Sequence, residues 1–481
     1  MVAQVVVLEM STNPDVADMQ RIFHAQRNGF QAHPMPSLKD RLVLLQRLRT
    51  FLLQFKDDLI EAVSADFGHR SPDETLFAEI MTTLEAIKYH ESHLAEWMRP
   101  QKRQVNPMHL PAKARVVYQP LGVVGIIVPW NYPIFLALGP LTAAIAAGNR
   151  VMIKMSGFTC ATASVLSRLL AEVAPSDVLA VYAGRGEISE AFSRLPFDQL
   201  TFTGSTEVGK KIMTAAAEHL TPVLLELGGK SPAIIHDSFS VEMAAERIAF
   251  GKCWNAGQTC VAPDYVLCNH SRLQDFVRAM QKQVHAMYPT MRENADYTAI
   301  INEKQYGRLQ NLLMDARKKG ATIIEINPGN EDFSQGKKMP LTLVLGVTPE
   351  MLVMQQEIFG PVLPVFGVSS LDEAIAFVRH RPRPLALYYF DHHPSRIAFV
   401  AEQTHSGGLG INEVLSHVGI EDLPFGGIGA SGMGRYHARE GFLTYSNAKA
   451  VLEKPKLYPL RFFLPPFNKG LHKFLKSYFI R

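Results

Sequence analysis

Cysteine is scarce in this chain of 481 residues, which has four: Cys160, Cys253, Cys260 and Cys268. No two of them form a C-x-x-C pair, and the seventeen histidines include no H-E-x-x-H motif. These absences argue against a disulfide framework, a redox dithiol and a zinc centre, so no metal is expected. So few thiols also predict a reducing compartment, and we expect a cytoplasmic protein.

An excess of charge of one sign and long apolar runs are also missing. The net charge of +4 is small for this length and gives no reason to expect nucleic-acid binding. No run of about 18 apolar residues occurs, so no membrane-spanning helix is predicted. The N-terminus has a short apolar run without a basic region or a cleavage pattern, so no signal peptide is expected. The composition is that of a globular protein long enough for two or three domains.

Buried strands alternate with helices from residue 122 onwards, whereas residues 16–104 have apolar side chains at helical spacing and are predicted to be helical. The predicted strands are 116–118, 122–128, 150–154, 178–182 and 199–202. The predicted helices are 141–148, 162–173 and one from residue 207. This order predicts a parallel sheet with helices on both faces, a fold that often binds nucleotides at the carboxyl ends of its strands. A second alternating region, from 233 to about 413, predicts a second α/β domain.

Two glycine-rich segments resemble nucleotide-binding motifs without meeting their requirements. Residues 427–432 read GIGASG and match G-x-G-x-x-G, but that fingerprint needs a strand before it and a helix that opens at the glycines. The residues before it, DLPFG at 422–426, do not predict such a strand, so a tight turn is the better interpretation. Residues 228–231 read GGKS, but a P-loop requires a glycine where Leu224 stands.

Cys260 and Glu226 are the residues with the most chemical information. Cys260 ends the segment CWNAGQTC at 253–260, and Glu226 opens the segment ELGGK at 226–230. A deprotonated thiol is a strong nucleophile, and a carboxylate can activate water to release what the thiol has captured. The pair suggests covalent catalysis followed by hydrolysis. An isolated cysteine is more often a small buried hydrophobe; we interpret Cys253 and Cys268 in this way, and Cys160 as structural.

Seven segments in one order point to a known superfamily. They are PWNYP at 129–133, Lys154, FTGST at 202–206, ELGG at 226–229, GQTC at 257–260, EIFGP at 357–361 and PFGG at 424–427. In this order and spacing they resemble the aldehyde dehydrogenase superfamily over nearly the whole chain. VAPDY at 261–265 and GMGRY at 432–436 look like its class 3 branch. Within that branch, DFGHRS at 66–71 is similar to bacterial coniferyl aldehyde dehydrogenases, with fatty and medium-chain aldehyde dehydrogenases as the alternative.

The resemblance implies an α/β, aldehyde dehydrogenase-like architecture. It has a Rossmann-type cofactor domain, an α/β catalytic domain that contains the cysteine, and a small β oligomerisation arm. We expect the cofactor domain at 1–104 and 122–228, the catalytic domain at 229–420, and the arm at 105–121 and 421–453. The resemblance also implies a homodimer, a small-molecule aldehyde substrate, and NAD or NADP as cofactor.

The family's catalytic roles correspond to three residues of this chain. Cys260 is expected to attack the aldehyde and form a thiohemiacetal. The side-chain amide of Asn131 and the backbone N–H of Cys260 are expected to hold the oxyanion, and one such donor is typically worth about 2.7–4 kcal/mol. After hydride transfer to the cofactor, Glu226 is expected to activate the water that hydrolyses the thioester. The presence of all three residues argues against a non-catalytic relative, and a base such as Glu226 argues against transfer of the thioester to coenzyme A.

The expected substrate pocket is formed by three aromatic side chains that adjoin these motifs, Tyr132, Trp254 and Phe425. An aromatic lining suits a flat cinnamaldehyde-type substrate, but it also suits an alkyl chain. The natural aldehyde therefore stays open at this point.

Cofactor contacts are expected from six residues: Trp130, Lys154, Gly204, Ser205, Glu357 and Phe359. Gly204 and Ser205 open a predicted helix, where free N–H groups and the positive end of the helix dipole suit a pyrophosphate. The resemblance assigns Lys154 to the adenine-side ribose, Glu357 to the nicotinamide ribose, and Phe359 to the side of the nicotinamide ring.

Gly157 departs from the family pattern, because members that prefer NAD commonly have a glutamate three residues after the lysine. Its absence removes a ligand for the ribose 2′-hydroxyl and a repulsion against a 2′-phosphate. We therefore expect NADP to be accepted, and a Gly157→Glu variant to shift the preference towards NAD.

The C-terminal residues 454–481 contain basic residues and no acidic one. Their apolar residues fall at helical spacing: Leu471, Phe474, Leu475, Tyr478 and Phe479. This pattern predicts a short basic amphipathic helix. Docking on the protein itself or on a partner subunit is the favoured hypothesis, and weak contact with an anionic membrane surface is the alternative.

Overall fold

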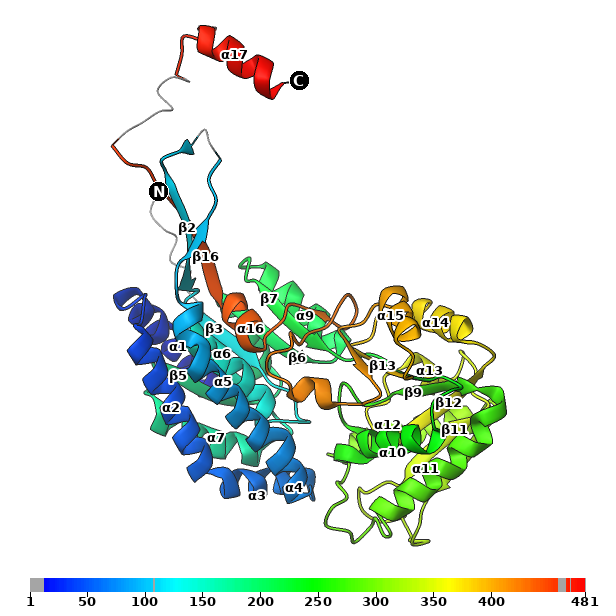
Figure 1. Ribbon diagram of the computed structural model, residues 1–481. Coiled ribbons are helices and arrows are strands. Elements are labelled where there is room, and N and C mark those ends of the chain that lie inside the picture. The colour runs from blue at the N-terminus through cyan, green and yellow to red at the C-terminus, as the bar shows by residue number, and fades with distance from the viewer. Residues whose placement is uncertain (1–12, 107–108, 457–463, 468, 481) are drawn as a thin grey trace.

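A sheet of parallel strands flanked by helices forms where the alternation predicts it (Figure 1). The computed structural model describes residues 13–106, 109–456, 464–467 and 469–480. The sheet has the order β15-β7-β6-β3-β4-β5 and is parallel except for β15. The strand bounds are β3 Val123–Ile127, β4 Arg150–Ser156, β5 Leu179–Gly184, β6 Gln199–Gly204, β7 Val223–Leu227 and β15 Gly432–Met433. The helices between them are α6 Phe135–Ala147, α7 Cys160–Val173, α8 Glu187–Ser193 and α9 Thr206–Ala217.

The order of these strands determines where a ligand can bind. The chain runs outwards from β3 to β4 and β5, and then returns to place β6 on the other side of β3. At such a reversal the loops after the two central strands diverge and leave a crevice at the carboxyl edge of the sheet. Those loops begin at Val128 and Ser205, next to the residues expected to bind the cofactor. The predicted strands are confirmed, whereas α6 begins earlier than predicted and α8 was not predicted.

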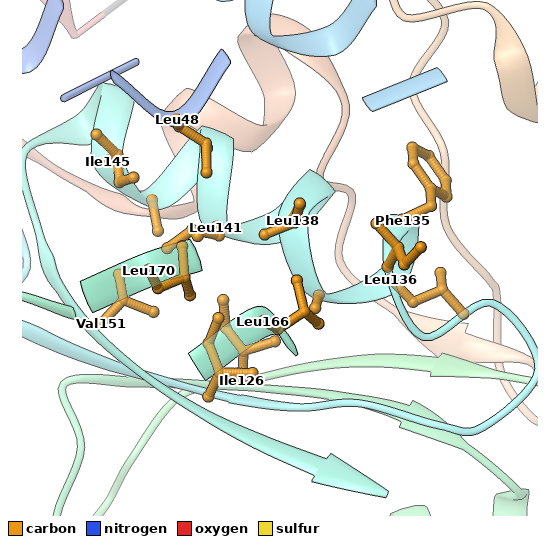
Figure 2. Close-up of a cluster of buried hydrophobic side chains, with 14 of the residues drawn as sticks. Leu48, Ile126, Phe135, Leu136, Leu138, Leu141, Ile145, Val151, Leu166 and Leu170 are labelled. Atoms are coloured by element: carbon orange, nitrogen blue, oxygen red, sulfur yellow. The ribbon is translucent and has the colours of Figure 1, made fainter. Parts of the chain in front are cut away.

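Helix α6 is buried on all sides, and this explains its composition. Every residue from Phe135 to Ala147 is buried, and none is charged. The helix ends at Gly148, whose φ of 92° is in the left-handed region that favours glycine. Leu138, Leu141 and Ile145 of α6 gather with side chains of α2, α7 and the sheet (Figure 2). Burial of each such side chain contributes roughly 1.5–3 kcal/mol.

The first of the N-terminal helices packs against the parallel sheet, and most of the later ones pack on α6 and α7. Their bounds are α1 Pro14–Ala32, α2 Leu38–Gln54, α3 Lys56–Phe67, α4 Pro72–Thr75 and α5 Thr82–Trp97, with a π-helical segment at Leu76–Met81. Helix α2 begins with a capping box, in which Ser37 and Asp40 each bond the other's backbone N–H. The helical prediction for 16–104 is wrong at its end, because residues 101–103 pair with β2 as strand β1.

The second α/β region forms a separate sheet of order β10-β11-β12-β9-β8-β13-β14, parallel except for the pair β10–β11. Its strands are β8 Pro232–Ile235, β9 Tyr265–Asn269, β10 Thr322–Ile326, β11 Leu341–Leu345, β12 Val362–Val368, β13 Ala386–Phe390 and β14 Gly408–Ile411. Its helices are α10 Val241–Cys253, α11 Leu273–Met287, α12 Glu303–Lys318, α13 Leu352–Gln355, α14 Leu371–Arg379 and α15 Pro394–Gln403. Short 3-10 segments lie at Trp254–Gly257, His270–Arg272 and Ser416–Gly419.

A three-stranded antiparallel sheet projects from the part of the molecule that contains the six-stranded sheet (Figure 1). It consists of β1 Gln101–Arg103, β2 Lys113–Pro120 and β16 Ser446–Glu453, and helix α16 Ala438–Thr444 leads into it. Helix α17, Gly470–Phe479, lies beyond this sheet with Phe474, Tyr478 and Phe479 exposed. Among the described residues, no helix is both long and apolar enough to cross a bilayer.

Candidate active site

Cys260 follows an unusual turn at the end of helix α10. The segment Trp254–Gly257 reverses the chain with three consecutive residues at positive φ. A Cβ on Gly257 would collide with the carbonyl of Gly360, so this position needs glycine for space as well as for conformation. The turn places Cys260, which is half-buried, on the wall of a cavity.

The other three cysteines lie away from this cavity wall. Cys253 and Cys268 are buried, as predicted for small hydrophobes, and Cys160 is exposed at the start of α7. All four thiols are free. Cys260 is therefore the cysteine that combines partial exposure with a cavity.

The Cys260 thiol is held in its neutral form in this structure. Burial raises its pKa to about 12, and the negative charges of Glu357 and Glu226 act in the same direction. The backbone N–H groups of Cys260 and Val261 oppose this effect, because they stabilise the negative charge of the thiolate and so lower the pKa. Both carboxylates therefore lie close enough to the thiol to act on its charge.

Glu226 lies on β7, between Thr203 of β6 and Gly432 of β15. Its side chain is buried, and neither carboxyl oxygen has a hydrogen-bond partner among the described residues. Burial raises its pKa well above the ordinary value, and the charge of Arg435 opposes the shift. A buried carboxyl without a partner is costly for stability, and such groups are typical of functional sites.

Glu357 is a buried carboxyl whose charge acts on the Cys260 thiol, and Phe359, two residues further on, is in contact with Trp130. A Cβ on Gly228 would collide with the carboxyl of Glu357, so the glycine leaves the space that this carboxyl fills. Burial, followed by the charge of Asp264, raises the pKa of Glu357 to about 8. Phe359 has a φ of 48°, and its ring meets the ring of Trp130 edge to face at 5.2 Å. The structure thus brings together Trp130 and Phe359, two of the residues predicted to contact the cofactor.

Lys154, Gly204 and Ser205 lie at the carboxyl edge of the parallel sheet. Lys154 of β4 pairs with Ile127 of β3 and is 6% exposed. Burial, followed by the charge of Arg185, lowers its pKa to about 8. Gly204 ends β6, and Ser205 is the residue that caps the start of α9. A helix N-terminus at this edge offers free N–H groups to an anion.

The cavity beside Cys260 has a volume of about 300 Å³ and an aromatic and aliphatic lining. It includes all three predicted pocket residues and, among the others that the sequence did not indicate, six large apolar side chains: Phe77, Phe135, Leu136, Phe250, Leu415 and Val418. Among the described residues, no charged side chain lines it. Phe77 comes from the π-helical segment, which no catalytic motif adjoins, whereas Phe135 and Leu136 open α6 just after the segment PWNYP at 129–133.

A buried ion pair supports the loop that contains Asn131. Arg70 is fully buried, pairs with Glu79 at 2.9 Å, and donates to the backbone carbonyl of Asn131 at 2.8 Å. Its guanidinium also lies 4.8 Å from the ring of Tyr132. The other carboxyl oxygen of Glu79 accepts from the backbone N–H of Ile134 at 2.7 Å. The pair therefore fixes the loop from both ends.

A second set of buried hydrogen bonds joins that loop to the turn before Cys260. The side-chain amide of Asn255 donates to the carbonyl of Asn131 at 3.2 Å, and its backbone N–H donates to Glu74 at 3.0 Å. The hydroxyls of Tyr132 and Thr259 lie 2.6 Å apart. These contacts attach the backbone of Asn131 to the turn that leads to Cys260. Sequence reasoning missed Arg70, Glu74 and Glu79; Arg70 at least stands in the distinctive segment DFGHRS at 66–71, whereas nothing in the sequence marked Glu74 and Glu79.

Comparison with known proteins decides the family. The aldehyde dehydrogenase family model matches residues 3–451. The chain belongs to the aldehyde dehydrogenase family.

Individual members of the family match this dehydrogenase over almost its whole length. A Pseudomonas aeruginosa protein named probable coniferyl aldehyde dehydrogenase is 51% identical, with 100% of both chains covered. The structure of a substrate-bound state of Staphylococcus aureus AldH superposes with a TM-score of 0.90 at 38% identity, covering 96% of this chain and 99% of that one. A Mycobacterium tuberculosis aldehyde dehydrogenase complexed with NAD+ has a TM-score of 0.83 at 30% identity, with 92% and 91% covered. The protein is thus an NAD(P)-dependent oxidoreductase that acts on aldehydes.

Proposed function

We propose that this aldehyde dehydrogenase oxidises a flat, conjugated aromatic aldehyde of the coniferyl aldehyde class to its carboxylic acid. The observation that carries the proposal is the cavity beside Cys260, which is uncharged and lined by aromatic residues such as Phe77, Trp254 and Phe425. Aromatic side chains make favourable stacked and edge-on contacts with an aromatic ligand, which favours a planar ring over a flexible alkyl chain. The name of the Pseudomonas aeruginosa relative agrees with this substrate class.

The test is kcat/KM of the purified protein for coniferyl aldehyde and for a saturated medium-chain aldehyde, with cofactor in excess. We expect an advantage of about tenfold or more for coniferyl aldehyde. The analogue with the same ring and a saturated side chain is the matched control, because it removes planarity and keeps the ring. A preference for the medium-chain aldehyde would contradict the proposal.

In the proposed mechanism, Cys260 loses its proton and attacks the aldehyde carbon. The oxyanion of the thiohemiacetal is held by the backbone N–H of Cys260 and the side-chain amide of Asn131. Bound NAD(P) supplies the acceptor for the hydride that leaves this carbon. The contacts of Arg70 and Asn255 with the carbonyl of Asn131 support this role, because they fix the backbone from which the amide projects.

Glu226 is the proposed base of the second half-reaction. Its raised pKa makes it a proton acceptor that is strong enough to activate water once it is ionised. Water then attacks the thioester carbon, the bond to the Cys260 sulfur breaks, and the carboxylic acid is released. The free carboxyl oxygens of Glu226 support this role, since both are available to a water molecule.

The residues at the sheet edge fit NAD(P) as the group to be bound. Glu357 has a buried oxygen without a partner among the described residues. Its carboxyl occupies the space that Gly228 leaves by having no side chain. We propose that Glu357 and Lys154 bind the two riboses, and that Phe359 and Trp130 lie beside the nicotinamide ring. The start of α9, at Gly204 and Ser205, is proposed to face the pyrophosphate.

The assembly is proposed to be a homodimer formed through the projecting sheet. Strand β16 is an edge strand within the described residues, and most of its side chains are exposed, which supports a role in pairing with a second copy. We also propose the expected division into domains at 1–104 with 122–228, 229–420, 105–121 with 421–453, and the tail 454–481, except that residues 101–103 belong with the projecting sheet. The cytoplasm is the proposed compartment, because its reducing conditions preserve a free catalytic thiol.

Helix α17 is proposed to dock on a partner subunit of this dimer. Its exposed aromatic residues lie beyond the projecting sheet, which supports contact with a second chain. Deletion of residues 454–481 should weaken the dimer, as measured by size-exclusion chromatography with light scattering. Neither the intact protein nor the truncated one should bind anionic vesicles. Co-sedimentation of the intact protein, but not of the truncated one, with anionic vesicles would favour the membrane surface instead.

A further inference from the structure

An arginine that the sequence motifs do not include lies at the adenosine side of the sheet edge. Arg185 follows directly after strand β5 and is exposed. Its Nε donates to the carbonyl of Gly157 at 2.9 Å, and its guanidinium lies 3.9 Å from the centre of the Phe158 ring. These two contacts hold the guanidinium over the loop that follows β4.

Gly157 provides the space that Arg185 fills. A Cβ on Gly157 would collide with the aliphatic part of the Arg185 side chain. Position 157 is the one at which a glutamate is expected in members that prefer NAD. The glycine therefore does more than remove a carboxylate, because it admits a cation to the same place.

Lys154 is a second cation beside Arg185. The charge of Arg185 acts on Lys154, and no carboxylate is among the groups that shift the pKa of this lysine. Lys154 lies in β4 and Arg185 just beyond β5, and these two strands are paired. Two neighbouring cations at the carboxyl edge form a place where an added phosphate would be favoured.

We propose that Arg185, in the space left by Gly157 and beside Lys154, binds the 2′-phosphate of NADP(H). The inference rests on the proposed placement of the adenine-side ribose at Lys154. An arginine near this ribose can accommodate a 2′-phosphate, because its planar fork of donors matches the phosphate oxygens. NAD lacks this phosphate and makes no use of Arg185.

The test measures binding of two adenosine fragments to the full-length protein without catalysis. Dissociation constants of 2′,5′-ADP and 5′-AMP are measured by calorimetry for the wild type and for Arg185→Gln. We expect Arg185→Gln to weaken 2′,5′-ADP about tenfold or more and to leave 5′-AMP within about twofold. Arg185→Lys should restore part of the loss, because it keeps the charge but not the fork.

The control is Arg194→Gln, which removes the same charge from the surface pairs of Arg194 with Glu190 and Glu218. It should leave both constants unchanged. An equal loss for both fragments in Arg185→Gln, or no loss for either, overturns the assignment of Arg185 to the 2′-phosphate. If the wild type binds neither fragment, the proposed placement of the ribose at Lys154 fails as well.

Gly157→Glu tests the same site by filling the space that Arg185 occupies. It adds a carboxylate and forces Arg185 to move, so NADPH binding should weaken more than in Arg185→Gln while NADH binding improves. Fluorescence titration of both reduced cofactors measures this. An unchanged ratio of the two dissociation constants would contradict the role of this position.

Discussion

The two sides of Cys260 differ in the chemistry of their side chains. On the aldehyde side, the cavity is lined by aromatic and aliphatic side chains without a charge among the described residues. On the proposed cofactor side lie Glu226, Glu357 and Lys154, each buried enough to shift its pKa. This difference supports the proposal that the two ligands are selected in different ways. In that proposal, shape and apolar contact select the aldehyde, whereas charge and close backbone approach select the cofactor.

The largest effect is expected from removing the Cys260 thiol, which lies between the two sides. Cys260→Ser should lower kcat about a thousandfold or more, because an alcohol is a much weaker nucleophile and no dedicated base faces it. Steady-state formation of NAD(P)H measures the loss. Cys268→Ser, at a buried cysteine away from the cavity, should keep kcat within about twofold. Unchanged turnover in Cys260→Ser would overturn the mechanism.

Arg70 tests this comparison at a buried charge behind the uncharged cavity, because it supports the loop that contains Tyr132, a lining residue. Arg70→Met leaves Glu79 buried without its partner, and the loss of such a pair costs about 3–5 kcal/mol of unfolding free energy. Chemical denaturation measures the change. Arg168→Met, at an exposed pair with Asp58, should cost less than about 1 kcal/mol. Equal effects in the two variants would show that burial of the Arg70 pair is unimportant.

Phe425 tests whether aromatic contact selects the aldehyde. Phe425→Leu should reduce the ratio of kcat/KM for coniferyl aldehyde over a medium-chain aldehyde about tenfold, because an aromatic contact is lost while apolar volume is largely kept. Phe399→Leu, at an exposed position of α15, is the matched control and should leave the ratio unchanged. A ratio that stays constant in both variants would remove Phe425 from the selection of substrate.

The pH dependence of alkylation tests the charge on the cofactor side. With a pKa of about 12, the thiolate fraction of Cys260 should rise about tenfold for each pH unit between about 7 and 9. The rate of Cys260 alkylation by iodoacetamide, followed by peptide mass spectrometry without cofactor, should rise in parallel. A plateau below about pH 9 would mean that the thiol is already ionised.

The sequence indicated the segments around Gly228 and Gly257 more completely than the lining of the cavity, for a physical reason. Glycines such as Gly228 and Gly257 are required by close contacts, so they stand in short motifs whose spacing can be recognised. The cavity instead needs only apolar side chains of suitable size, and Phe77 or Leu136 carry no mark that separates a lining residue from a core residue.

The parallel strands were predictable because their continuous apolar runs reflect burial on both faces. Strand β1 was not, because three residues beside a long helical region acquire their conformation only by pairing with β2. Arg70 and Arg185 were missed for a similar reason. An arginine in a sequence gives no indication of whether it lies in solvent, pairs with a distant Glu79, or covers a distant Gly157.

Capture of the acyl-enzyme tests most directly the claim that Cys260 joins these two sides in one covalent reaction. Glu226→Gln, mixed with coniferyl aldehyde and NADP, should form one equivalent of NADPH rapidly and then turn over slowly, since the proposed base is absent. Intact-protein and peptide mass spectrometry should find the acyl group of the substrate on Cys260. No acyl group on Cys260, together with wild-type turnover in Glu226→Gln, would contradict the account.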